Sequence, residues 1–278
     1  MRSQMKFRET LGLMGVGNMG QAILEGLFSK RMVTGSRVWV FDTILQKAAE
    51  FSKKWQCRQA KSNAEIVKQT DIVILAMKPQ DFSSAMKGLK SVFRNRQTVI
   101  SILAGTSVEK IRREIGPRPQ VIRAMPNLGV KVGEGITAIA TTGVKTLSLQ
   151  AARKIFSGCG KTVELEESYL DLVTALSGSG PAYFFLVMEL MVKEGVRQGI
   201  PEGQSRLLAV QTALGAATLA ASSSQSPEAL RQMVTSKGGT TAAALAVLEE
   251  GKFSDVFHRA LEAAVERSRE LSKRQPPA

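Results

Sequence analysis

Short apolar runs alternate with amphipathic stretches through the first 165 residues of the chain. The runs are rich in Val, Ile and Leu, as in parallel strands that are covered on both faces. They predict strands over 10–14, 38–41, 71–76, 98–103 and 120–124. Apolar residues at helical spacing predict helices over 19–29, 45–55, 63–69, 81–91 and 108–115. This alternation predicts an α/β fold with a doubly wound, mostly parallel sheet. Segments 136–140 and 162–165 could add edge strands, with a helix over 149–156 between them.

The pattern changes after residue 165, where no further strand is predicted. Helices are expected over 167–176, 181–198, 201–221, 227–235, 240–249 and 253–273. We therefore predict two domains, 1–165 and an all-helical 166–278. Residues 182–192 are apolar nearly all round, and such a helix has to be buried on every side. Either a partner subunit supplies one side or the helix is central in its own bundle.

Composition narrows the class of protein. Two cysteines, Cys57 and Cys159, form no metal-binding or disulfide pattern, and the one histidine, His258, argues against a zinc site. No secretory signal and no apolar run of membrane-spanning length is present, so we expect a soluble, cytoplasmic protein without a metal. The net charge of +14 falls on the N-terminal half, because residues 166–278 hold 11 Lys/Arg against 13 Asp/Glu. These bases are scattered with few aromatic residues among them, which favours a solvated surface or an anionic cofactor over nucleic acid.

A glycine-rich loop follows the first predicted strand and opens the first predicted helix. Its residues are Gly15, Val16, Gly17, Asn18, Met19 and Gly20. Gly15 permits a tight turn, Gly17 leaves room for a pyrophosphate, and Gly20 lets the helix lie close to the strand. In this context the pattern predicts a Rossmann-like domain that binds a nicotinamide dinucleotide. The alternative is an ordinary glycine-rich turn.

The cofactor's identity depends first on Asp42, which ends the second predicted strand 22 residues after Gly20. An acid at this place usually holds the ribose hydroxyls and disfavours the 2′-phosphate of NADPH. The basic surplus and nearby Lys47 favour NADPH instead, so the expectation is NADPH or NADH. Alternatively, Asp42 caps the helix predicted over 45–55.

The second half offers a place for a small acidic substrate. The run from Ser236 to Thr241 combines hydroxyls and glycines just before a predicted helix, which suits a carboxylate. His258 lies among ordinary surface spacings, so no general base is evident. A protonated imine needs orientation more than a base, which makes a C=N bond a suitable target.

These motifs together resemble pyrroline-5-carboxylate reductase over nearly the whole chain. The most specific stretches are Asp171-Leu-Val-Thr174-Ala-Leu-Ser-Gly-Ser-Gly-Pro-Ala-Tyr183 and Ser236-Lys-Gly-Gly-Thr-Thr241, with support from Ala76-Met-Lys-Pro79 and Arg123-Ala-Met-Pro-Asn127. The resemblance implies NAD(P)H-dependent reduction of 1-pyrroline-5-carboxylate to L-proline, the last step of proline biosynthesis. It also implies a homodimer with interlocked helical domains, often assembled into a decamer of five dimers.

The resemblance further implies roles for individual residues. Thr174 would lie near the ring nitrogen and orient the iminium, and Ser236, Gly239, Thr240 and Thr241 would bind the substrate carboxylate. The loop from Gly15 to Gly20 would hold the pyrophosphate, and the rest of the cofactor would contact Asn63, Ala76, Met77, Lys78, Pro79, Ala104, Met125, Pro126 and Asn127.

The chain departs from the family pattern at Leu128-Gly129, where Thr-Pro is usual, at Lys237, where a proline or small residue is common, and at Met77, where valine is common. Leu128 puts the shape of the nicotinamide pocket in question. Alternatives to the reductase are an enzyme for other cyclic imino acids, a dinucleotide sensor without turnover, and a nucleic-acid binder.

Overall fold

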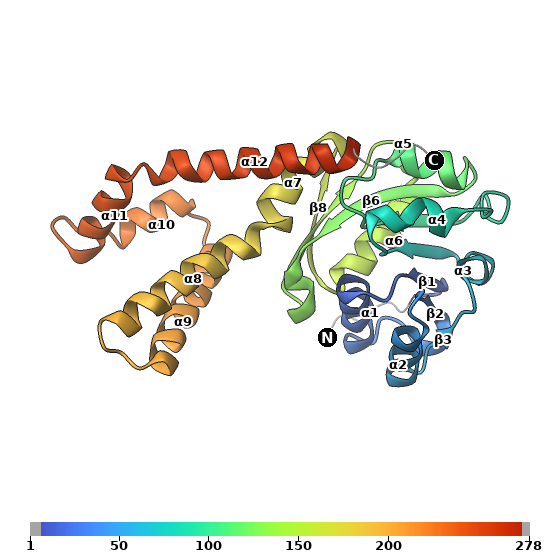
Figure 1. The fold of residues 1–278 in the computed structure, drawn as a ribbon, viewed down its shortest axis with the longest axis horizontal. Helices are drawn as coiled ribbons and strands as arrows, with labels where there is room; N and C mark the ends of the chain where they lie inside the picture. Colours follow the sequence, from blue (N-terminus) through green and yellow to red (C-terminus); the bar gives the residue numbers. More distant parts are fainter. Residues whose placement is uncertain (1–6, 274–278) are drawn as a thin grey trace. The chain divides into compact units, whose positions relative to one another are not determined.

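The computed structural model of the chain describes residues 7–273 (Figure 1). Its centre is an eight-stranded sheet with the order β3-β2-β1-β4-β5-β6-β7-β8. Neighbouring strands are parallel except β6 and β7. The strands are β1 (Leu11–Met14), β2 (Val38–Phe41), β3 (Arg58–Gln59), β4 (Ile72–Leu75), β5 (Thr98–Ser101), β6 (Gln120–Pro126), β7 (Gly135–Ala140) and β8 (Gly160–Leu165). The predicted α/β fold class is confirmed.

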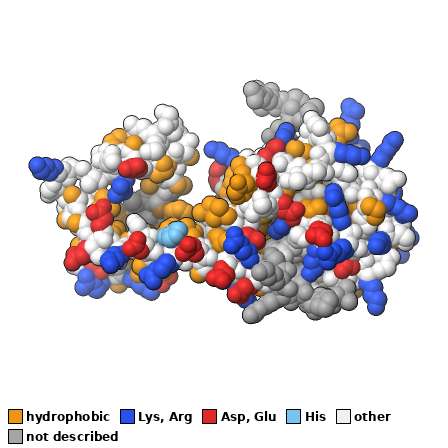
Figure 2. Space-filling view, turned by 90° about the horizontal axis from the view of Figure 1, so that it is seen from above, with side chains coloured by type: hydrophobic (Ala, Val, Ile, Leu, Met, Phe, Trp, Pro, Cys, Tyr) orange, Lys and Arg blue, Asp and Glu red, His pale blue; other side chains and the backbone are white. Residues whose placement is uncertain are grey.

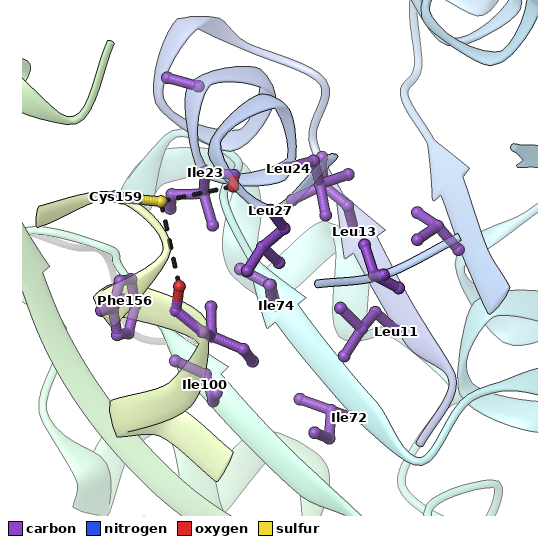
Figure 3. Close-up of a cluster of buried hydrophobic side chains, with 14 of the residues drawn as sticks. Leu11, Leu13, Ile23, Leu24, Leu27, Ile72, Ile74, Ile100, Phe156 and Cys159 are labelled. Atoms are coloured by element: carbon purple, nitrogen blue, oxygen red, sulfur yellow. Dashed lines mark hydrogen bonds between the residues drawn. The ribbon is translucent and has the colours of Figure 1, made fainter. Parts of the chain in front are cut away.

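Two hydrophobic cores cover the two faces of the sheet. Successive strand residues point to opposite faces, so Ile72 and Ile74 enter one core while Val73 and Leu75 enter the other. The first core is closed by α1 (Asn18–Ser29), α2 (Leu45–Trp55) and α6 (Thr146–Ser157), as Figure 3 shows for α1 and α6. The second is closed by α3 (Asn63–Gln69), α4 (Phe82–Met86) and α5 (Val108–Ile115). Burial on both faces explains the continuous apolar runs of the central strands.

Most predicted elements of this part agree with the structure to within a few residues. The helix predicted over 81–91 is wrong in extent, because a 3₁₀ turn (Pro79–Asp81) precedes α4 and the helix ends before Gly88 at φ +77°. β3 was not predicted, since it has two exposed polar residues and no apolar pattern. The segment predicted as the edge strand 136–140 lies inside the sheet as β7, between β6 and β8.

The chain folds into two compact units. Of the described residues, 7–179 and 264–273 form the first, and Gly180–Ala263 form the second. By these contacts the segment after β8 belongs with the sheet: it comprises a 3₁₀ turn (Glu167–Tyr169), α7 (Leu170–Val173) and a π-helix (Thr174–Gly178). Leu170 and Val173 pack on Ala138 and Ala140 of β7. The single helix predicted over 167–176 is thus three short pieces, and the domain boundary predicted after residue 165 stays a prediction.

The second unit is helical. It contains α8 (Gly180–Arg197), α9 (Glu202–Ser222), α10 (Pro227–Met233), α11 (Thr240–Glu250) and most of α12 (Phe253–Lys273). α8 and α9 approach closely, because a Cβ on Gly195 would lie 2.6 Å from Ser205 Oγ. The Tyr183 and Phe257 rings meet edge to face with centroids 5.8 Å apart.

Large apolar side chains remain on the surface of this unit, where hydrophobic groups are visible among the charges in Figure 2. On α8, Phe184 is 67% exposed and Leu190 is 55% exposed. By length and composition alone, one helical stretch of the described chain, Glu167–Arg197, could also cross a membrane. An apolar surface of this extent is unusual for a soluble monomer and calls for a covering partner.

Candidate cofactor and substrate site

The carboxyl ends of the parallel strands gather the predicted cofactor residues at one edge of the sheet. Gly15 follows β1, Asp42 follows β2, Ala76 follows β4, Ala104 lies beyond β5, and Asn127 follows β6. The connections run outward in both directions from β1 and β4, where the strand order reverses. Ligands of doubly wound sheets bind in the crevice at such a reversal.

The loop after β1 is built on close backbone approach. Gly15 has φ +93°, and a Cβ there would lie 2.7–2.8 Å from backbone atoms of Ala76 and Met77. Gly20 is equally confined, since its Cβ would lie 2.7 Å from the Gly15 carbonyl oxygen. The loops after β1 and β4 therefore touch at Gly15, and no larger residue fits there.

The next glycine has the opposite surroundings. A Cβ added to Gly17 would meet no atom within 4 Å. Gly17 is the N-cap of α1, no side chain caps that end, and the first turn holds no acidic residue. The first N–H groups of α1, from Asn18 onward, thus have no side-chain cap and lie next to the open position at Gly17, at the positive end of a twelve-residue helix. These residues fit a dinucleotide pyrophosphate.

Asp42 ties this loop to the end of β2. Its Oδ2 accepts a hydrogen bond from Val16 N at 2.7 Å, and its Oδ1 accepts one from Ile44 N at 2.8 Å. The N-cap of α2 is Ile44, so Asp42 is not the helix cap that was the alternative prediction. Both carboxylate oxygens bond to the backbone, and the carboxylate holds Val16 in place whether or not it also meets a ribose.

The predicted adenosine side is formed by the loops after β3 and β4. The Asn63 amide donates to the Ala85 carbonyl of α4 at 3.2 Å, which fixes its orientation. Ala76 N donates to Met14 O at 2.8 Å, and Pro79 begins the 3₁₀ turn before α4. Lys78 between them is exposed, and Met77 is partly buried against the second core.

The predicted nicotinamide side lies at the end of β6. Met125 and Pro126 are its last residues, and Asn127 Oδ1 accepts from Ile136 N at 3.1 Å. A Cβ on Gly178 would lie 2.7 Å from Met125 Cε and 3.7 Å from Thr174 Cγ2. The fold therefore brings together Met125 and the π-helix that carries Thr174, which are far apart in sequence.

The hydroxyl of Thr174 has a defined direction. It donates to the Leu170 carbonyl at 2.8 Å, and the Thr174 carbonyl accepts from Ser179 N at 2.8 Å across the π turn. Because its proton is engaged, Thr174 Oγ1 offers lone pairs rather than a donor. π-Helical turns are rare and recur at functional sites.

The predicted carboxylate loop belongs to the second unit. Gly238 has φ +73°, and Gly239 is the N-cap of α11 and donates its N–H to Ser236 O at 3.0 Å. The first turn of α11 holds no acidic residue. Thr240 is exposed and Thr241 is half-buried, so hydroxyls and free helix N–H groups meet at this end.

Polar anchors around α7 were missed by the sequence reasoning. Glu167 Oε1 accepts from Arg123 Nη1 at 2.9 Å and from Val108 N at 2.8 Å. Asp171 Oδ1 accepts from Ser268 Oγ at 2.7 Å. Asp171 lies in the motif that carries the family resemblance. Its partner Ser268 lies 97 residues further along the chain, so no local sequence pattern reveals the pair.

Other candidate groups do not contribute to this edge. Cys159 is buried against α1, and burial raises its pKa to about 11, so it is a poor nucleophile (Figure 3). In the described part of the chain, no three His, Cys, Asp or Glu side chains are placed to hold a metal ion. A groove of about 1010 Å³ lies at the opposite edge, beside Ile72 and Thr98 at the amino ends of β4 and β5, away from the glycine loop.

Comparison with known proteins finds two family models that match different parts of the chain. Residues 10–105 match the family model "NADP oxidoreductase coenzyme F420-dependent", and residues 167–271 match the model for pyrroline-5-carboxylate reductase dimerisation. A pyrroline-5-carboxylate reductase of Methanosarcina acetivorans is 38% identical over 96% of this chain and 99% of its own length. The chain belongs to the pyrroline-5-carboxylate reductase family. The Escherichia coli member is 33% identical over 95% of this chain and 98% of its own.

Solved structures of the family have the same fold. The Coxiella burnetii reductase has a TM-score of 0.88 at 34% identity and covers 96% of this chain and 99% of its own. The Plasmodium falciparum reductase, solved with NADP bound, has a TM-score of 0.86 at 29% identity over 96% of this chain and 99% of its own. The predicted family is confirmed, and its members are NAD(P)-dependent oxidoreductases that form oligomers.

Proposed function

We propose that this chain reduces 1-pyrroline-5-carboxylate to L-proline with NADPH or NADH, using the residues at the carboxyl edge of the sheet. Family membership supports the reaction. The observation that carries the site is the contact between Met125 and the π-helix of Thr174, on the same unit as the open loop at Gly17. In this proposal the cofactor loop and Thr174 therefore belong to the same compact unit.

The chain's contribution to cofactor binding follows from the loop geometry. Gly15, Val16, Gly17, Asn18, Met19 and Gly20 hold the pyrophosphate through backbone N–H groups and the end of α1. Asn63 and Ala76–Pro79 line the adenosine side, and Ala104 and Met125–Asn127 line the nicotinamide side. When bound, the reduced nicotinamide supplies a hydride for C5 of the imine.

Thr174 recognises the protonated imine by accepting a hydrogen bond. Its proton is engaged by the Leu170 carbonyl, so its lone pairs suit the N–H of an iminium. As C5 gains the hydride, the C=N π electrons move to nitrogen, which already carries its proton. No general acid or base is required at that step. The neutral hydroxyl of Thr174 therefore only has to bind the ring N–H and does not have to transfer a proton. Orientation is then the main task of the site.

The substrate carboxylate is held by Ser236, Gly239, Thr240 and Thr241 at the start of α11. Two threonine hydroxyls and uncapped helix N–H groups supply donors without a buried charge. Lys237 adds a positive charge at this loop and raises the attraction for an anion.

A second copy of the chain covers the apolar helices in this proposal. The helical part matches a dimerisation model, and α8 and α9 together bury only Gly180, Ser205 and Ala209 within one chain. A protein partner suits the charges Glu189, Lys193 and Glu194 on α8 better than lipid does. We therefore expect a soluble, cytoplasmic homodimer, with a decamer of five dimers as the larger assembly.

Steady-state kinetics with purified protein test the proposal. We expect turnover of 1-pyrroline-5-carboxylate with at least one cofactor, and slower turnover of six-membered imino acids. A preference for the six-membered ring, or no turnover with either cofactor, would contradict it.

A glycine pair provides the matched test of the cofactor loop. Gly17→Val has open space in the free protein, so it should fold normally but bind both cofactors at least tenfold more weakly, because its side chain fills the pyrophosphate position. Gly15→Val should instead destabilise the fold, because its φ is positive and backbone lies within 2.8 Å. Normal cofactor affinity in Gly17→Val would place the pyrophosphate elsewhere.

A further inference from the structure

Thr174 begins a π turn inside the longer helical stretch Glu167–Arg197. α7 has four residues, a single turn, and the π-helix follows directly. A π turn is a local departure from regular helix geometry, so the contacts of the α7 turn that precedes it help to set where Thr174 lies. The direction of the Thr174 hydroxyl therefore depends on tertiary anchors of α7.

Besides Glu167, which holds the turn before α7 through Arg123 and Val108, α7 itself has two kinds of anchor. Leu170 and Val173 pack on β7 and fix its depth against the sheet. Asp171 reaches the other way and accepts a hydrogen bond from Ser268 at 2.7 Å. Ser268 is 4% exposed and lies near the end of α12, where the chain has returned from the second unit to the first; Figure 1 shows this end beside α7.

A carboxylate bonded to a buried hydroxyl is a strong and directional restraint. Charge-assisted hydrogen bonds are about twice as strong as neutral ones. The bond between Asp171 and Ser268 holds the residue next to Leu170 in sequence. The Leu170 carbonyl in turn accepts the hydrogen bond of the Thr174 hydroxyl. Leu170 and Val173 fix the distance of α7 from the sheet, and the bond of Asp171 adds a directional restraint on another side of the turn.

We propose that Asp171 and Ser268 are a positioning pair that fixes the rotation of α7 and so aims the Thr174 hydroxyl. The inference rests on the proposed function of Thr174 and adds two residues that touch neither substrate nor cofactor. Without the bond, α7 turns, the Leu170 carbonyl moves, and Thr174 loses its place beside Met125. A displacement of about 1 Å in such a group costs on the order of 100-fold in rate.

The test removes each partner and then both. Asp171→Ala and Ser268→Ala should each lower kcat by roughly 10- to 100-fold, with the cofactor Kd unchanged within about twofold. The double variant should match the single ones, because all three lack the same bond. Asp171→Asn keeps an acceptor oxygen and should recover most of kcat.

Two further measurements separate positioning from loss of stability. Val265→Ala trims a half-buried side chain on the same returning stretch of α12 and is the control: it should lower Tm but leave kcat within about twofold. Hydrogen exchange at Ser179 N, which donates across the π turn to Thr174, should speed up about tenfold in Asp171→Ala and Ser268→Ala but not in the control.

Several outcomes overturn the pair. The first is an unchanged kcat in both single variants, and the second is an additive loss of kcat in the double variant. The third is a loss of both kcat and cofactor affinity that Val265→Ala reproduces. If the wild type does not reduce 1-pyrroline-5-carboxylate, the proposed function fails by itself. Exchange at Ser179 then still decides the pair, because unchanged protection in both single variants refutes it.

Discussion

Replacing Asp42 tests whether its carboxylate only holds the glycine loop in place or also binds the ribose of the cofactor. In Asp42→Ala, the N–H groups of Val16 and Ile44 lose their carboxylate acceptors at 2.7 and 2.8 Å. Hydrogen bonds to a charged group contribute about 1.5–3 kcal/mol each when well buried. Asp42 is half-buried, so hydrogen bonds to water replace part of the lost free energy. We therefore expect a net loss of about 1.4 kcal/mol in the free energy of cofactor binding, which is about tenfold in Kd.

The two cofactors provide the decisive comparison for Asp42. A carboxylate that only holds the loop contributes equally to the binding of both cofactors. Asp42→Ala should therefore raise the Kd for NADH and for NADPH by the same factor within about twofold, as measured by calorimetry. Glu50→Ala is the control for the lost charge, since Glu50 is exposed on α2 and bonds to Gln46. The reasoning is refuted if NADH binding weakens while NADPH binding improves, because Asp42 would then be reading the ribose.

Three further predictions concern the carboxylate loop, the anchor of α7 and the buried thiol. Thr241→Ala should raise KM for the imino acid about tenfold with cofactor KM unchanged; a larger effect on the cofactor would misplace that loop. Glu167→Ala should lower the free energy of unfolding in urea by about 2 kcal/mol, because Arg123 is only 11% exposed, whereas Glu109→Ala, which breaks an exposed pair with Arg113, should cost under about 0.5 kcal/mol; equal losses would contradict this. The pKa of Cys159 is raised from 9.0 to about 11, so between those pH values the unfolded state loses its proton first and stability falls, by up to about 3 kcal/mol. Cys159→Ala should show a shallower fall of Tm over that range than the wild type, and identical slopes would refute the shift.

The sequence predicted the central sheet well because each strand is buried on both faces and carries a plain apolar signal. β4, with Ile72 and Ile74 in one core and Val73 and Leu75 in the other, is the clearest case. β3 has no such signal, since its two residues are exposed and pair only through the backbone of β2. Edge pairing of this kind is decided by the neighbouring strand and not by local pattern.

In the candidate site, too, some features could be predicted from the sequence and others could not. The glycine loop was readable because close backbone approach at Gly15 and Gly20 demands glycine itself. The role of Asp42 was not, because an acid after β2 suits a ribose, a cap or a loop bond equally until its partners are known. The π-helix was hidden as well, since the stretch around Thr174 has an ordinary helical composition and no local pattern marks the extra residue in its turn.

The return of α12 to the first unit has a consequence for biosynthesis. The first unit is interrupted in sequence, so its last piece, from Ala264 onward, leaves the ribosome only after the whole of Gly180–Ala263. At about 5–20 residues per second, that interval lasts several seconds or more. During it, α8 and α9 present their apolar side chains while α7 still lacks Ser268. A nascent chain of this design is therefore most vulnerable to aggregation late in its synthesis, and its dependence on chaperones should be concentrated there.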